Sequence, residues 1–146
     1  MRIKLVVFYS AMSLLFLNGC TTYHSAVAKG NLEAINRLLG EGDDVNAPND
    51  RGITPLIHAV NLNQKESLLA LIKAGADINL GDVELDNTPL HYAIQQGNVT
   101  FVRILLGNGA KVNLRNKEGV TALKLLESSH NENMLRLLNG YKKGKI

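Results

Sequence analysis

Cysteine is almost absent from this chain of 146 residues, which contains only Cys20. A single cysteine has no partner within the chain, so an internal disulfide framework is excluded. The chain also lacks a glycine-rich phosphate loop, a serine nucleophile elbow and a His-Glu-x-x-His pair. The four histidines are scattered, and the adjacent acids Asp43 and Asp44 are expected to be solvated in a turn. We therefore predict no catalytic residues, no cofactor and no metal site.

No apolar run is long enough for a permanent membrane span. Residues 5–17 are apolar apart from Tyr9, Ser10 and Ser13. As a helix they would rise about 20 Å, whereas the hydrocarbon layer of a bilayer is about 30 Å thick. Positive charge at Arg2 and Lys4 precedes the run, which is the order of a secretory signal. A buried core helix is the alternative, but it would show a polar face that this segment lacks. We predict that residues 1–19 are a signal peptide.

The end of this segment reads Leu17-Asn18-Gly19-Cys20 and resembles a bacterial lipobox. The resemblance implies cleavage between Gly19 and Cys20, diacylglycerol on the thiol of Cys20 and acylation of the new amine. Ordinary secretion with an unmodified Cys20 is the alternative. Two or more acyl chains anchor a protein stably, whereas one binds a membrane only marginally.

The residue after the cysteine is Thr21 rather than aspartate. By resemblance to the sorting pattern of enteric bacteria, this implies the outer membrane of the cell envelope, facing the periplasm. Residues 20–24 are then a short tether, because the four residues after Cys20 span at most about 14 Å. The domain is expected to lie close against the bilayer.

Net charge is small once the predicted signal peptide is set aside. Residues 1–19 hold two of the 16 basic residues and none of the 13 acidic ones, which leaves 14 basic residues against 13 acidic ones. A nucleic-acid partner would need a concentrated basic face, and secretion argues against one. The remaining 127 residues suit one domain.

The rest of the chain repeats itself at a period near 33 residues. Three segments each place apolar residues on one helical face and end in a glycine-led turn: "GNLEAINRLLGEGDDVN" from Gly30, "NQKESLLALIKAGADIN" from Asn63 and "GNVTFVRILLGNGAKVN" from Gly97. A glycine at the end of a helix allows the left-handed conformation that commonly terminates it.

A second signature lies between these segments. Residues 88–93 read "TPLHYA", residues 54–59 read "TPLIHA", and residues 121–123 retain "TAL". Threonine is a natural helix cap, and proline at the first helical position costs no hydrogen bond. The chain resembles the ankyrin repeat, whose unit contains a Thr-Pro-Leu-His-x-Ala motif, a helix-turn-helix and a hairpin loop. Ile57 stands where the motif has histidine, so the usual histidine hydrogen bond is not expected there.

The resemblance implies an all-α repeat solenoid of about four ankyrin repeats over residues 25–141, followed by a basic tail at 142–146. The first and last repeats are predicted to be degenerate caps, because a terminal repeat has one face in water. The first repeat is taken to lack the Thr-Pro-Leu-His opening. The second of the three hairpin junctions, from Gly75 to Thr88, is one residue longer than the junctions before and after it.

Charge is distributed unevenly along the array. Residues 20–99 hold five basic and ten acidic residues, whereas residues 100–146 hold nine basic and three acidic ones. Ankyrin proteins recognise other proteins with their hairpin tips and concave groove, so such a gradient would orient a partner of reverse polarity. The alternative is that these charges only keep the array soluble. The predicted partner-binding residues are Asp43, Asp44, Asp50, His58, Asn61, Asp77, Asp82, Glu84, Asp86, Tyr92, Gln95, Lys111, Arg115 and Lys117.

The leading hypothesis from the sequence is a monomeric, membrane-anchored, non-catalytic protein-binding lipoprotein. A sharper version is an immunity protein that neutralises a toxin acting in the periplasm, such as a phospholipase. A scaffold or assembly factor that binds an envelope protein of the same cell is the alternative. An enzyme would need activity from groove residues such as His58 and Asp82. Tyr92 is the best anchor candidate, because tyrosine is enriched in binding hot spots.

Overall fold

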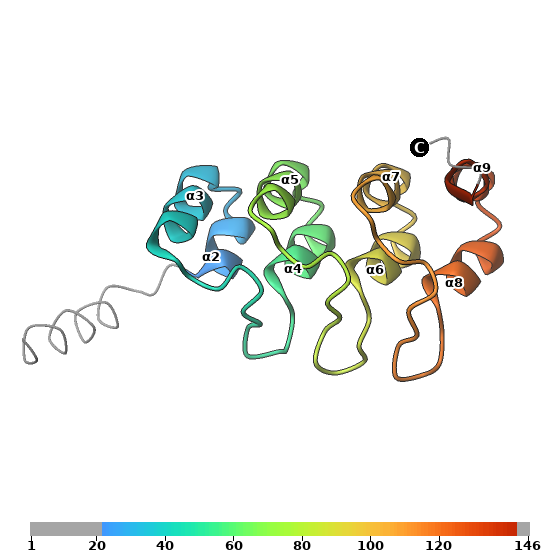
Figure 1. Ribbon diagram of the computed structural model, residues 1–146, viewed down its shortest axis with the longest axis horizontal. Coiled ribbons are helices and arrows are strands. Elements are labelled where there is room, and N and C mark those ends of the chain that lie inside the picture. Colours follow the sequence, from blue (N-terminus) through green and yellow to red (C-terminus); the bar gives the residue numbers. More distant parts are fainter. Residues whose placement is uncertain (1–21, 143–146) are drawn as a thin grey trace, which may run out of the picture.

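The computed structural model describes residues 22–142, which form eight helices in four antiparallel pairs (Figure 1). The first helices of the pairs, called the inner helices, lie side by side, and the second helices form a parallel row above them. The inner helices are α2 (Tyr23–Ala28), α4 (Pro55–Asn61), α6 (Pro89–Gln95) and α8 (Ala122–Ser128). The second row is α3 (Leu32–Glu41), α5 (Lys65–Lys73), α7 (Val99–Gly107) and α9 (Glu132–Lys142). No strand occurs in this part of the chain, so the predicted all-α repeat solenoid is confirmed.

Each inner helix begins at a threonine cap. The side-chain oxygens of Thr54 and Thr121 accept hydrogen bonds from backbone amides three residues later, and Pro55 and Pro89 occupy the first helical position. In α6 the backbone amide of Thr88 donates to His91 Nδ1. The cap therefore satisfies amides that a helix leaves without partners in its first turn.

The first repeat carries more of the motif than the sequence predicted. His24 Nε2 bonds to the carbonyl of Ile53 at 2.7 Å, and His91 Nε2 bonds to the carbonyl of Val120 at 3.3 Å. Both carbonyls lie 29 residues further along the chain, so His24 is the motif histidine of the first repeat. The first repeat therefore keeps the histidine of the motif, although Thr22 and Tyr23 stand in place of its proline and leucine.

The first helix also begins earlier than the predicted boundary at residue 25. Helix α2 starts at Tyr23 because the Thr22 side chain caps it, accepting from the backbone amide of Ser25. The stretch expected to be a tether therefore already contains helical residues. At the other end, α9 runs through Lys142, one residue into the expected tail.

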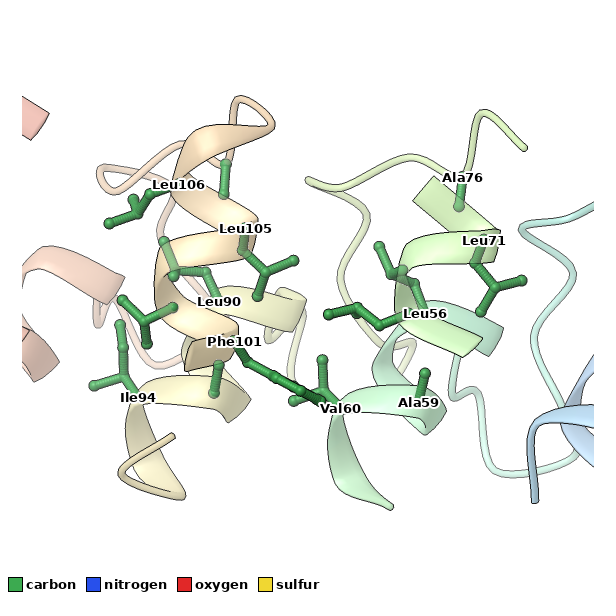
Figure 2. Packing of buried hydrophobic residues seen from close by; sticks show 14 of the residues in the cluster. Leu56, Ala59, Val60, Leu71, Ala76, Leu90, Ile94, Phe101, Leu105 and Leu106 are labelled. Carbon is green, nitrogen blue, oxygen red and sulfur yellow. The ribbon is translucent and has the colours of Figure 1, made fainter. Parts of the chain in front are cut away.

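The core consists of columns of equivalent side chains that pass through all four repeats. One column is Leu38, Leu71, Leu105 and Leu138, and each of these is at most 4% exposed. Figure 2 shows Phe101 of α7 reaching across to Val60 of α4, and the two are 2% and 0% exposed. In such an array each repeat contacts only its neighbours, so these seams carry most of the stability.

Three long loops project on the side of the inner helices away from the second row (Figure 1). We call them finger 1 (residues 43–53), finger 2 (77–87) and finger 3 (111–120). In finger 1 the Asn49 side chain accepts from the amides of Arg51 and Ile53, and Asn116 plays the same part in finger 3. Finger 2 contains the extra residue that the sequence revealed.

Gly81 is required by this longer loop. A Cβ on Gly81 would lie 2.4 Å from Asp86 Oδ1 and 2.6 Å from the Asp86 carbonyl carbon. We expect Gly81→Ala to lower the free energy of unfolding by about 1–3 kcal/mol, because the backbone of Asp86 must move. Urea unfolding measures this. As a control, Gly107→Ala lies in α7 with no atom within 4 Å of the new Cβ. It should leave stability unchanged or raise it by up to about 1 kcal/mol. Equal effects of the two changes would contradict this description of finger 2.

Candidate functional site

Most of the predicted contact charges lie exposed on the fingers. Exposed residues of this set are Asp43, Asp44, Asp50, Asp77, Glu84, Asp86, Lys111, Arg115 and Lys117. Asp44 and Asp77 also accept from backbone amides two residues later, which fixes the loops in which they lie. None of these charges forms an ion pair with another residue of the range 22–142, whereas Arg37 and Glu41 of α3 do. The finger charges therefore remain free to attract a partner.

Asp82 is the exception, and its predicted role as a surface contact must be corrected. It is 3% exposed, because its carboxylate points into the base of finger 2. Oδ1 accepts from the amides of Glu84 and Leu85, at 3.0 and 2.7 Å, and Oδ2 accepts from the amide of Asn87 at 2.9 Å. A buried carboxylate requires such partners. Asp82 shapes the finger and does not present a charge to a partner.

The basic residues of finger 3 also hold the loops together. Lys117 Nζ donates to the carbonyl of Val83 at 2.6 Å, and Arg115 donates to the carbonyl of Gly119 at 3.1 Å. Both side chains remain exposed, so their charges still act at the surface. Finger 3 is thus a positively charged neighbour of the acidic finger 2.

Hydrogen bonds join the three fingers into one row. The amide of Val83 donates to the carbonyl of Gly52 at 3.0 Å, and the amide of Lys117 donates to the carbonyl of Leu85 at 2.8 Å. Below the tips, the Asn116 side chain donates to that of Asn87 at 2.8 Å. Finger 2 lies in the middle and is held from both sides.

The predicted groove corresponds to the surface of the inner helices α4 and α6, which carry four residues of the predicted set. Asn61 and Gln95 are exposed, whereas His58 and Tyr92 are half-buried. The Tyr92 hydroxyl donates to Asp82 Oδ2 at 3.2 Å, which ties the groove to finger 2. Burial, together with the nearby charge of Asp82, raises the pKa of Tyr92 above its ordinary value. Tyr92 is therefore a fixed wall of the groove and less available as an anchor than the sequence suggested.

His58 is paired with His24 rather than standing alone. Their ring centroids lie 5.4 Å apart at an interplanar angle of 56°. Burial lowers the pKa of His24, although the bond to the Ile53 carbonyl opposes this, and burial and then His24 lower the pKa of His58. Burial also lowers the pKa of His91. All three imidazoles are thus held toward the neutral form.

This arrangement predicts weaker folding in mild acid. Because the folded-state pKa of His24, His58 and His91 lies below 6.5, the unfolded chain binds more protons as the pH falls below that value. Stability is therefore full above about pH 6.5 and is lost as the pH falls through the folded-state pKa values. The urea concentration at the unfolding midpoint should decrease as the pH is lowered from about 7.5 to about 5.5. His58→Gln should flatten this fall, because it removes one imidazole and a like charge beside His24. A midpoint that is constant or rises toward acid would contradict the prediction.

Finger 2 exposes apolar side chains that the sequence reasoning did not identify as a site. Val83 is 64% exposed, Leu80 is 38% exposed and Leu85 is 36% exposed. The extra residue at this junction was one hint, but nothing in the sequence indicates that the valine and leucine side chains point outward. Among residues 22–142, no group of three or more His, Cys, Asp or Glu side chains could hold a metal ion. No helix in the same residues is long and apolar enough to cross a bilayer.

Comparisons with known proteins agree with this repeat geometry. Residues 4–82 match a family model described as "Ankyrin repeats (3 copies)", and residues 60–126 match one described as "Ankyrin repeats (many copies)". The chain belongs to the ankyrin-repeat family. Ankyrin repeats are typically non-catalytic and imply that this chain binds another protein.

Several animal proteins contain ankyrin repeats similar to this chain. A putative palmitoyltransferase ZDHHC13 from Danio rerio is 34% identical over 147 residues, which cover 100% of this chain and 23% of the relative. Inversin from Mus musculus is 34% identical over 79% of this chain and 11% of the relative. Alpha-latrotoxin-Lg1a from Latrodectus geometricus is 31% identical over 82% of this chain and 9% of the relative. The chain spans less than a quarter of each, so the similarity concerns the ankyrin repeats.

Proposed function

We propose that this ankyrin chain is a membrane-anchored, non-catalytic protein-binding lipoprotein of the bacterial envelope. The observation that carries the anchor is the order of residues 1–20: basic residues, an apolar run and then Leu17-Asn18-Gly19-Cys20. These residues lie outside the described part of the chain, so the anchor rests on sequence alone. The observation that supports binding is a row of joined fingers whose exposed charges have no ion-pair partner in residues 22–142.

The position of the anchor relative to the first helix favours a partner at the membrane. Helix α2 begins at Tyr23, three residues after Cys20. Those residues span at most about 10 Å. An acylated Cys20 would hold the first repeat at the bilayer, facing the periplasm if the outer membrane is the destination. The partner then works at that membrane or visits it.

The family match starts at residue 4 and so includes most of the predicted signal peptide. If residues 4–19 belonged to a repeat, they would remain in the mature protein. The two interpretations therefore differ in the mass of the chain found in cells and in its lipid content.

Metabolic labelling with palmitate tests the anchor. We expect label on the protein, loss of label in Cys20→Ser, and an intact mass that lacks residues 1–19. Unlabelled protein that retains its first residues would disprove the lipoprotein proposal and favour a repeat at the N-terminus. An Asn18→Ala control should keep the label, since that residue is not the acylated one.

Within this function, the sharper proposal is an immunity protein that neutralises a toxin acting in the periplasm, such as a phospholipase. It is motivated by three features: the chain is small and has one proposed binding surface, the predicted anchor lies close to the first helix, and the charge of the finger row changes from acidic to basic along the array. Cells that lack the gene should be killed by sibling cells that deliver the toxin, and the wild-type gene should restore resistance. Equal survival with and without the gene would refute the immunity role.

The alternative is a scaffold or assembly factor for an envelope protein of the same cell. It rests on the same finger row, but it predicts a partner made by that cell and no effect on sibling killing. Identifying the captured partner by mass spectrometry decides between the two roles. A toxin encoded beside this gene would favour immunity.

A further inference from the structure

Finger 2 differs from its neighbours in the way it turns. Fingers 1 and 3 turn at Gly52 and Gly119, which have φ values of +71° and +73°. Finger 2 has no glycine at this place and turns instead at Asp86, whose φ is +58°. Aspartate tolerates this left-handed conformation better than most residues. The longer turn places a Val-Glu-Leu-Asp tip, residues 83–86, where the neighbours carry a short polar turn.

The tip combines exposed apolar and acidic side chains. Val83 is 64% exposed, more than any other large hydrophobic residue among residues 22–142, and Leu85 is 36% exposed. Glu84 and Asp86 alternate with them and are exposed as well. Contact with water is unfavourable for apolar side chains that are this exposed. A partner that buried them would gain binding free energy from removing this surface from water. A loop that only needed to be soluble would gain nothing from them.

The backbone of the tip is fixed before any partner arrives. Asp82 accepts from the amides of Glu84 and Leu85, the amide of Val83 donates to Gly52, and the carbonyls of Val83 and Leu85 accept from Lys117. Binding therefore requires little additional ordering of the loop, which reduces the entropy cost of association.

We infer that residues 83–86 are the central contact of the partner-binding surface, with Val83 and Leu85 entering an apolar pocket on the partner. This inference rests on the proposed protein-binding function and specifies its site and the chemistry of the partner. The partner is a protein whose pocket is bordered by lysine or arginine. Its basic groups face Glu84, Asp86 and, on finger 1, Asp50, because Lys117 places a positive charge on the opposite side of the tip.

The groove offers a weaker contact than the tip. The Tyr92 hydroxyl is bonded to Asp82, and the exposed Gln96 side chain donates to Asn61 at 3.2 Å. A membrane surface also fits poorly, because Glu84 and Asp86 would be repelled by anionic headgroups. A lipid contact is therefore an outcome that would contradict the inference.

Site-specific photo-crosslinking tests this assignment in cells that naturally make the full chain. Benzoylphenylalanine is placed at Val83, at His58 in the groove, and at Leu69 on α5, which is 42% exposed and lies in the row opposite the fingers. The inference expects one protein adduct from position 83 and none from position 69. Mass spectrometry of the crosslinked peptide should place the adduct in an apolar pocket with basic residues at its edge.

The partner identified in this way is then titrated with the full chain. Val83→Asn and Glu84→Lys should each weaken binding about ten-fold, through lost apolar burial and reversed charge. Leu69→Asn, the matched exposed apolar control, should change binding less than two-fold. Added salt should weaken the wild-type complex more than the Glu84→Lys complex, because it screens the attraction that this change removes.

Each other result overturns the inference. An adduct from position 58 alone would move the contact to the groove and leave the proposed function intact. A lipid adduct at position 83, or unchanged affinity in Val83→Asn, would remove the tip from the protein interface. No protein adduct at any position would contradict both the inference and the proposed protein-binding function.

Discussion

Replacing Phe101 with alanine is expected to lower the free energy of unfolding by about 3–5 kcal/mol. The Phe101 ring is 2% exposed and fills the middle seam, where it reaches from α7 to Val60 of α4 (Figure 2). Its equivalents in the other repeats are the smaller or more flexible Ala34, Ser67 and Met134. Ser67 is itself buried, and its hydroxyl has no hydrogen-bond partner. Among these four equivalent positions only Phe101 carries an aromatic ring, so its removal leaves a large cavity in the middle seam.

The change should also reduce cooperativity. Because each repeat contacts only its neighbours, a cavity in the middle seam uncouples the first two repeats from the last two. Urea unfolding followed by circular dichroism should show a lower midpoint and a smaller slope. Leu69→Ala, on the exposed side of α5, serves as the control and should cost less than about 1 kcal/mol. A Phe101→Ala cost below about 1 kcal/mol would mean that the middle seam does not hold the array together.

Replacing Asp82 with alanine should lower the free energy of unfolding by about 2–4 kcal/mol, because four donors, one of them buried and three part-buried, lose a charged acceptor at once. The amides of Glu84, Leu85 and Asn87 and the hydroxyl of Tyr92 all donate to this carboxylate. Two of these amides belong to the tip of finger 2. Hydrogen exchange at Glu84 and Leu85 should therefore accelerate more than exchange in the helices.

Tyr92→Phe is the matched control for this prediction. It removes one of the four hydrogen bonds and leaves the three backbone amides paired with Asp82. It should lower the free energy of unfolding by about 0.5–1.5 kcal/mol and leave amide hydrogen exchange at Glu84 and Leu85 unchanged. If Asp82→Ala were no more harmful than Tyr92→Phe, the carboxylate would not be what shapes finger 2.

The repeat architecture could be predicted from the sequence because its signals are local. Threonine caps, prolines at the first helical position and glycines after the helices recur at fixed spacing, and each has its own physical reason. The role of His24 was missed because Thr22 and Tyr23 replace the proline and leucine of the motif. Only the bond to the Ile53 carbonyl makes the equivalence with His91 evident.

The details of the candidate site depend on contacts between repeats, and the sequence does not show these. An aspartate in a polar loop is normally solvated, so the burial of Asp82 becomes intelligible only once its amide donors and Tyr92 are in place. For Val83 and Leu85 the expectation was wrong in the opposite direction. Apolar residues are expected to be buried, but these two are exposed. Their exposure follows from Asp82 and Lys117 holding the tip outward.

The measurement that tests the central claim most directly is quantitative capture of proteins from cell envelopes on the full-length chain. The same experiment is run with Asp82→Ala, which disturbs finger 2, and with Leu69→Asn, which leaves the fingers intact. We predict one protein that is retained by the wild-type chain and by Leu69→Asn but lost with Asp82→Ala. If the wild-type chain retained no protein, or if all three chains retained the same proteins equally, the finger row would not be a protein-binding surface.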